Sequence, residues 1–541
     1  MEWTKAQKKT IELRNKNILV SAAAGSGKTA VLVERIKQLV IKDFVDIDRF
    51  LIATFTNAAS LEMKERLEKL IRDEIKNSGN DLKKQKFLRR QLELLPKASI
   101  GTFHNFALEI MKQYFYLTDL EPGFKIGDDV QISIMKRESA DELFENRFEN
   151  DFEKFKEFLK KYSSDRSENR IKNNIISIYD ELRSIPDYLK WAEERTDMLG
   201  VQFPLVSLNI ADFILKDTED SLYEAEMLYS EAADLIFEEG IESLAEKSRQ
   251  DAENVEFLRI QIEHILDEKF KTGLMDTNEA ENILKSLKSI KLNTMRASKA
   301  EQESYNSIKE KVSNLRKRGK KLIDDTAKVY FSCSFDEYGR ELNEIYPDTK
   351  YFLELIAELE TIFKEKKREK NMVDFDDIMH YAIDILKNDM ASAEYRDRFE
   401  YLFIDEFQDS NMLQEMIIEK IARDNNLFMV GDVKQSIYKF RLAEPEIFKK
   451  KYELYSSSLE SKSEKIDLNN NFRSKFKVTE TVNRVFENIM EDYDENSKLH
   501  CTVNSDDKGY ESRLTIIDKS DDEVKVKETS HIEAQAAADI I

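Results

Sequence analysis

Cysteine and proline are scarce in this 541-residue chain, and each scarcity excludes a class of protein. The two cysteines, Cys333 and Cys501, are too few for a disulfide framework and too far apart for a metal-ligand spacing. With 6 prolines and 13 glycines there are few helix breakers, which favours long helices. No apolar run reaches the length of about 18 residues that a membrane span needs, and the N-terminus lacks the apolar segment of a signal peptide. We therefore expect a cytoplasmic protein that does not contact a membrane.

Charge is abundant, with an excess of acidic residues. The chain carries 85 Lys and Arg against 107 Asp and Glu, which gives a formal net charge of −22. This balance disfavours a nucleic-acid ligand, because phosphate binding needs local positive charge. It does not exclude one, since a single cationic groove on an acidic body still presents a positive local field. The length predicts roughly two to four domains.

Short apolar runs alternate with helical patterns in the first and last parts of the chain. These runs are residues 17–20, 50–54, 98–102, 401–404, 426–430 and 465–468. Such alternation predicts an α/β fold with a parallel sheet. From about residue 128 to 370 the sequence is charged and helical, as in 241–271 and 299–321. Because the α/β pattern returns afterwards, we expect a helical insertion rather than a separate domain that follows.

A small-residue loop follows the first apolar run and opens a helix. It reads Ser21-Ala22-Ala23-Ala24-Gly25-Ser26-Gly27-Lys28-Thr29. Small residues let backbone N–H groups surround a phosphate, and the helix N-terminus adds a favourable dipole. In such a P-loop Lys28 reaches the β- and γ-phosphates and Thr29 holds Mg²⁺. Ala22 replaces the usual first glycine, and a loop of this type without nucleotide is the alternative.

An acidic pair, Asp405-Glu406, follows the fourth apolar run. An Asp at a strand end can hold the Mg²⁺ of a nucleotide, and an adjacent Glu can take a proton from attacking water. Alone, such a pair is more often a helix cap. Together with the loop at Lys28 it predicts a hydrolytic site.

Two later segments carry further candidates. In the first, Asp432 and Gln435 follow an apolar run and precede Tyr438 and Phe440, a spacing that can join a phosphate-sensing group to a base-stacking platform. Core aromatics on a helix are the alternative. In the second, Arg473 follows the last apolar run and is a candidate charge clamp on a transferring phosphoryl group. A solvated arginine in a surface turn is the alternative.

In their order, these segments resemble the motifs of UvrD/Rep-type superfamily 1 helicases. The matching segments are residues 3–7 (Q-motif), 22–29 (motif I), 54–57 with 62–66 (Ia), 101–104 (Ib), 405–410 (II), 431–441 (III) and 471–474 (IV). Within that family, residues 21–35, 373–377 and 428–448 are most similar to the AddA (or RexA) component of AddAB helicase–nucleases. The resemblance covers the whole chain and is strongest at 1–110 and 371–475.

The resemblance implies a RecA-like P-loop NTPase sheet with a large all-helical insertion and a partial second RecA-like domain. Residues 1–110 and 371–465 would form motor domain 1A, 111–370 the helical domain 1B, and 466–541 the start of domain 2A. Motifs V and VI and the nuclease domain are expected to be missing from this chain.

It also implies a role for individual residues. ATP would be bound by Gln7, Ala22, Ala23, Ala24, Gly25, Ser26, Gly27, Lys28, Thr29 and Phe472, and Mg²⁺ by Thr29 and Asp405. Glu406, Gln435 and Arg473 would be catalytic. DNA would contact Phe55, Thr56, Asn57, Thr102, His104, Tyr438 and Phe440, although a lone histidine such as His104 is more often structural. Phe440 stands where UvrD has Trp, and Phe472 where UvrD has Tyr.

The implied function is an ATP-dependent, 3′→5′ DNA helicase or translocase. It would be the A-type component of a helicase–nuclease in double-strand break repair, acting on single- and double-stranded DNA with a B-type partner (AddB or RexB). A nucleotide-binding interaction module that moves no strand is one rival, although Glu406 disfavours it. A chain that binds ATP and DNA but cannot translocate is another. The basic runs 83–90 and 316–321 either contact duplex phosphates or are solvated helix faces.

Overall fold

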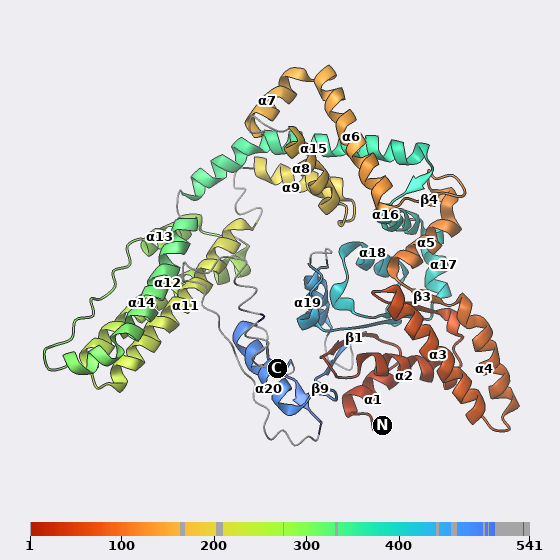
Figure 1. The fold of residues 1–541 in the computed structure, drawn as a ribbon, viewed down its shortest axis with the longest axis horizontal. Helices are drawn as coiled ribbons and strands as arrows, with labels where there is room; N and C mark the ends of the chain where they lie inside the picture. Colours follow the sequence, from red (N-terminus) through yellow and green to blue (C-terminus); the bar gives the residue numbers. More distant parts are fainter. Residues whose placement is uncertain are drawn as a thin grey trace. The chain divides into compact units, whose positions relative to one another are not determined.

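The computed structural model describes residues 2–162, 168–201, 209–273, 275–330, 334–439, 443–455, 462–490, 493–495, 497–503 and 534. The chain divides into two compact units (Figure 1). Unit 1 comprises residues 1–135, 183–186 and 365–541, and unit 2 comprises 136–182 and 187–364. No helix within the described ranges is long and apolar enough to cross a membrane.

Unit 1 is built on a six-stranded parallel sheet with the order β3-β2-β6-β7-β1-β8. Its strands are β1 (Asn17–Ala22), β2 (Phe50–Ala53), β3 (Ser99–Gly101), β6 (Tyr401–Ile404), β7 (Leu427–Gly431) and β8 (Ser463–Leu468). All pairings between them are parallel. The six apolar runs of the sequence are these six strands, so the predicted parallel α/β sheet is confirmed. Because β6 and β7 lie between β2 and β1, the first and last parts of the chain build one sheet.

The burial of each strand explains its sequence. Every residue of β2 and β7 is buried, as expected of central parallel strands covered on both faces. The edge strand β8 alternates instead, with every second side chain buried. It pairs with β1 without interruption up to Leu468, on both sides of position 465, the end expected for domain 1A.

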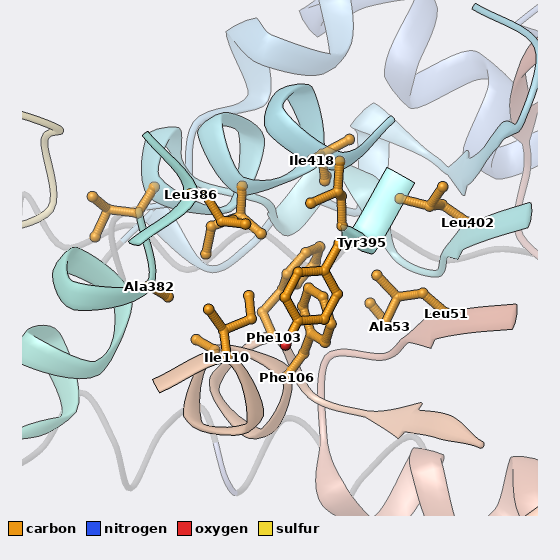
Figure 2. Close-up of a cluster of buried hydrophobic side chains, with 14 of the residues drawn as sticks. Leu51, Ala53, Phe103, Phe106, Ile110, Ala382, Leu386, Tyr395, Leu402 and Ile418 are labelled. Carbon is orange, nitrogen blue, oxygen red and sulfur yellow. The ribbon is translucent and has the colours of Figure 1, made fainter. Parts of the chain in front are cut away.

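Helices cover both faces of the sheet. One core gathers side chains of α5 (Phe103–Tyr114), α16 (Phe375–Leu386), α17 (Asp389–Arg398), α18 (Met412–Ile421) and α19 (Pro445–Leu454). The other gathers those of α1 (Lys5–Glu12), α2 (Lys28–Ile41), α3 (Asn57–Asn77) and α4 (Leu82–Leu94). Alternate strand residues enter opposite cores: Leu51 and Leu402 point into the first (Figure 2), and Ile52 and Phe403 into the second.

Shorter elements complete unit 1. Two small parallel pairs join β4 (Lys125–Ile126) to β5 (Met372–Val373) and β9 (Asn470–Asn471) to β10 (His500–Cys501). Helix α20 (Phe476–Ile489) follows β9.

A buried cluster of four charges lies in unit 1 where the chain returns from unit 2. Arg183 donates to Asp374 and Asp377, each at 2.7 Å, and Lys367 donates to the same carboxylates at 2.8 and 2.6 Å. Asp374 and Asp377 are also the reciprocal capping box of α16. The side chains of Arg183 and Lys367 are only 3% and 5% exposed. The cluster therefore fixes two returning segments to the first turn of α16.

Unit 2 is helical throughout its described part. Its helices are most of α6 (Asp129–Asn150) and α15 (Phe335–Glu369), with α7 (Phe152–Tyr162), α8 (Glu168–Leu182), α9 (Tyr188–Asp197), α11 (Ile210–Glu238), α12 (Glu242–Thr272), α13 (Thr277–Leu287) and α14 (Gln302–Tyr330). α11, α12 and α14 share one core, to which Leu222, Ile262 and Ile323 belong.

The basic run 316–321 of α14 does not form a single cationic face. Arg316 points inward and pairs at 2.7 Å with Asp251, which is fully buried. Arg318 and Lys320 pair with acidic residues of unit 2. The expectation that this whole run contacts phosphates is therefore wrong for Arg316, whose charge is already neutralised inside the helical core.

Candidate functional site

The predicted motifs meet at one edge of the sheet. The P-loop follows β1, the Asp405-Glu406 pair follows β6, and the segment from Asp432 follows β7. Because the strands are parallel, their carboxyl ends lie on the same side, where α/β sheets bind ligands.

Two glycines give the P-loop its shape. Gly25 and Gly27 have φ of +73° and +85°, a left-handed conformation that favours glycine. A Cβ at Gly25 would also lie 2.7 Å from Asn471 Nδ2. Gly27 is the N-cap of α2, so the helix N-terminus begins directly at Lys28.

The carbonyl groups of residues 24–26 all accept hydrogen bonds from outside the loop. Their donors, in order, are Asn471 Nδ2 at 2.8 Å, the backbone N–H of Phe472 at 2.9 Å and Gln7 Nε2 at 3.0 Å. These contacts fix the loop from its carbonyl side.

The opposite groups of the loop are left without partners. The backbone N–H groups of Ala24, Gly25 and Gly27 donate to no acceptor in the described ranges, and Ser26 Oγ is buried without a hydrogen bond. Unpaired donors before a helix N-terminus are the arrangement that binds phosphate. The loop therefore fits the phosphates of a nucleotide.

Gln7 is buried, and its amide is held at both ends. Its Oε1 accepts the N–H of Thr4 at 3.0 Å in the capping box of α1, while its Nε2 reaches Ser26 O. Gln7 thus supports the P-loop, and its recognition of adenine stays a prediction.

The side chains of motifs I, II and III converge on Lys28. Its Nζ lies 3.0 Å from Glu406 Oε2 and 3.4 Å from Gln435 Oε1. Gln435 in turn donates to Asp432 at 2.7 Å. One cationic group is therefore shared between the candidate base and the candidate sensor.

Negative charge accumulates beside Lys28. Burial, and after it the charge of Glu406, raises the pKa of Asp405 to about 6. The same two causes raise the pKa of Asp409 to about 6, and its Oδ1 is buried without a partner. Glu406 itself has φ of +51°, a left-handed backbone that is strained for a residue with a side chain. A site that disfavours its own carboxylate charges is suited to receive a cation.

The chemistry of these oxygens fits Mg²⁺. No group of three or more His, Cys, Asp and Glu able to hold a metal occurs among the described residues. Mg²⁺ does not require such a group, because it is usually bound through one or two carboxylates together with substrate phosphates. Asp405 and Thr29 line the same cavity and can supply that share.

This cavity has a volume of about 590 Å³ and joins the two predicted activities. Besides Thr29 and Asp405, it is lined by groups predicted for hydrolysis and for DNA: Glu406, Gln435, Phe55, Thr56 and Tyr438. The rings of Phe55 and Tyr438 pack together, with centroids 4.7 Å apart and planes at 32°. The predicted stacking residues of motifs Ia and III therefore form one half-buried aromatic pair.

Three polar residues predicted to contact DNA are engaged in local structure. Thr56 and Thr102 are the N-caps of α3 and α5, where each side-chain oxygen accepts a backbone N–H. Asn57 accepts from Asn105 Nδ2 at 3.0 Å, which links motif Ia to motif Ib. These contacts fix the loops after β2 and β3, and they leave DNA contact by these residues as a prediction.

The remaining predicted residues differ in their setting. His104 packs edge-to-face on Phe375 at 6.1 Å, and burial lowers the pKa of its imidazole. Phe472 and Arg473 are exposed next to the P-loop, and Arg473 makes no ion pair with a described residue. Phe440 lies outside the described residues.

Sequence reasoning did not single out Gln408 or Asn471 as site residues. Gln408 is buried, donates to Glu406 and Asp409 at 2.9 and 3.0 Å, and accepts the N–H of Asp432 at 2.9 Å. It therefore joins motif II to motif III. The available signal was its position inside motif II, two residues after the candidate base.

Comparison with known proteins agrees with this geometry. Residues 3–456 match the family described as UvrD/REP helicase N-terminal domain. The A component of the ATP-dependent helicase/nuclease from Alkaliphilus oremlandii is 37% identical over 508 residues, which cover 92% of this chain and 41% of the relative. The proteins of the same name from Syntrophomonas wolfei and Bacillus velezensis are 37% and 33% identical, over 98% and 99% of this chain and 42% and 44% of theirs.

The chain thus spans about two fifths of the length of these relatives. The family match extends from the Q-motif beyond motif III and so includes the P-loop, the acidic pair at Asp405 and the Lys28–Gln435 contact. On these grounds the chain belongs to the UvrD/REP helicase family.

Proposed function

We propose that this chain is the ATP-hydrolysing part of a DNA helicase or translocase. The observation that carries the proposal is the shared cavity, in which Glu406 and Gln435 lie together with the aromatic pair Phe55 and Tyr438. A helicase must connect phosphate chemistry to a nucleic-acid surface, and one cavity lined by both kinds of group supports that connection.

ATP binding would begin at the P-loop. The unpaired N–H groups of Ala24, Gly25 and Gly27 receive the phosphates, and Lys28 exchanges Glu406 for the β- and γ-phosphate oxygens. Thr29 and Asp405 would hold Mg²⁺, which neutralises phosphate charge when bound. The exchange releases the Glu406 carboxylate.

Hydrolysis would then use Glu406 as the base. A water oxygen forms a bond to the γ-phosphorus while the bond from that phosphorus to the β–γ bridging oxygen breaks. The water proton passes to the Glu406 carboxylate, and ADP and phosphate are the products. Arg473, next to the loop, stabilises the charge of the transferring group.

Gln435 would report the state of the γ-phosphate to the DNA side. It lies between Lys28 and Asp432, and Tyr438 follows three residues later. Loss of the γ-phosphate changes the partner of Gln435, and the short segment transmits that change to the Phe55–Tyr438 pair. Single-stranded DNA would stack there.

The larger assembly follows from the names of the relatives. They are A components of an ATP-dependent helicase/nuclease, so we propose a B-type partner, a nuclease activity in the whole protein and a cytoplasmic role in double-strand break repair with 3′→5′ movement. We also propose that unit 2 belongs to the inserted domain 1B and that the segment after β8 opens domain 2A.

Glu406→Gln tests the proposal. Nucleotide should still bind, because Asp405 keeps its metal role, while the ATP turnover rate falls by about 10² or more. Glu419→Gln, which changes an exposed glutamate of α18, is the matched control. Turnover is measured with and without single-stranded DNA, and nucleotide affinity with a fluorescent ATP analogue.

The same assay separates the rivals. DNA-stimulated turnover that depends on Glu406 supports a motor. Nucleotide binding without turnover would instead support an interaction module. Stimulated turnover without strand movement identifies a chain that hydrolyses ATP but cannot translocate.

A further inference from the structure

Asn471 lies at the junction of the P-loop and the turn that carries Arg473. It is only 2% exposed. Its Nδ2 donates to Ala24 O at 2.8 Å, while its Oδ1 accepts the backbone N–H groups of Arg473 at 2.9 Å and Ser474 at 2.7 Å. Its own carbonyl accepts the N–H and hydroxyl of Thr502 at 3.0 and 2.8 Å. Both polar atoms of the side chain are therefore used.

The two segments are also in close steric contact. A Cβ at Gly25 would lie 2.7 Å from Asn471 Nδ2 and 3.1 Å from the Cβ of Arg473. The backbone N–H of Phe472 donates to Gly25 O at 2.9 Å. The contact is on the carbonyl side of the loop, so the N–H side stays open for phosphate.

Only an amide of this length meets both demands. Aspartate keeps the acceptor for the Arg473 turn but presents a second oxygen to Ala24 O, where a donor is needed. Alanine removes both interactions and leaves buried groups of the loop and turn unpaired, which is costly. The Arg473 side chain itself is exposed and has no ion-pair partner in the described ranges, so its position depends on the backbone that Asn471 holds.

We propose that Asn471 is a positioning residue that couples phosphate binding in the P-loop to the placement of Arg473. Phosphate draws the unpaired N–H groups of the loop inward, and neighbouring peptide units carry the carbonyls that Asn471 and Phe472 hold. Any change in the loop therefore reaches the backbone of Arg473 through one side chain. This inference rests on the proposed ATP hydrolysis.

The test is a double-mutant cycle on steady-state ATP turnover by the whole chain. Asn471→Ala should lower kcat by about tenfold when Arg473 is present and by less than about twofold in an Arg473→Ala background, because groups that act as a unit are not additive. Equal losses in both backgrounds would mean that Asn471 acts only on the fold, and would overturn the proposal.

Asn471→Asp separates the two halves of the contact. It keeps the acceptor for Arg473 but opposes Ala24 O, so the KM for ATP should rise by about tenfold while kcat changes less. Asn470→Asp places the same charge one residue earlier, on a side chain without a hydrogen bond in the described ranges, and is the matched control. If the two variants raise KM equally, the effect is simply charge and the proposal fails. Absence of turnover in the unmodified chain refutes the proposed function itself and removes the basis of the proposal, whereas additivity with normal turnover refutes only the role of Asn471.

Discussion

Removal of one charge from the buried cluster at the start of α16 should destabilise the protein strongly. Arg183 and Lys367 together balance Asp374 and Asp377, so the cluster is neutral as it stands. Arg183→Met leaves a net negative charge and breaks two hydrogen bonds of 2.7 Å. Breaking a buried ion pair from one side costs about 3–5 kcal/mol, because the remaining charge stays buried without its partner.

Urea unfolding of the variant measures this loss. Arg137→Met, which removes an exposed arginine of α6, is the control and should change the free energy of unfolding by no more than about 0.5 kcal/mol. The double change Arg183→Met with Asp377→Asn restores neutrality, and its cost should be smaller than the sum of the two single costs. If Arg183→Met costs no more than Arg137→Met, the cluster contributes no stability and the reasoning is wrong.

The cluster also predicts how stability varies with pH. Burial alone would raise the pKa of Asp374, but the charges of Arg183 and Lys367 outweigh it and hold that pKa well below its usual value. A carboxylate with a lowered pKa stabilises the fold above its unfolded pKa, which is about 4, and this stability is lost as the pH falls further. Arg183→Met should therefore reduce the acid-dependent part of the stability.

Two further predictions concern the site. Lys28→Ala should abolish ATP turnover because the phosphates lose their main cationic contact; normal turnover by a folded variant would remove the P-loop assignment. Tyr438→Ala should weaken single-stranded DNA binding by about 5- to 150-fold, since stacking contributes roughly 1–3 kcal/mol per base, while turnover without DNA changes little. A lowered melting temperature with unchanged DNA affinity would show that Tyr438 and its neighbour Phe55 serve packing alone.

The sheet could be predicted because its signal is local. Each apolar run is short, has turn residues or a helical pattern beside it and becomes a strand buried as its pattern requires. The P-loop and the acidic pair could be predicted for the same reason, since the residues that define them are adjacent in the sequence.

Contacts between distant segments could not be predicted in this way. Asn471 reaches Ala24 across 447 positions, and no pattern near either residue announces the other. The threonines Thr56 and Thr102 carried an ambiguous signal, because a threonine before a helix is a common N-cap as well as a candidate DNA contact. Arg316 was different, since it lies four residues after Val312 and seven before Ile323, on the buried face of α14. Helical periodicity could have placed it inside.

The strand order has a consequence for how the chain folds during synthesis. Both neighbours of β1 in the sheet, β7 and β8, come from the last part of the described chain, and residues 102–400 separate β3 from β6. At about 5–20 residues per second the ribosome needs roughly 15–60 s to make that interval. Until then β1 has open hydrogen-bonding edges on both sides, the state from which β-strands aggregate. The helices of unit 2 depend on contacts closer in sequence and can form meanwhile, so the last strands to be made decide when the nucleotide-binding edge first exists.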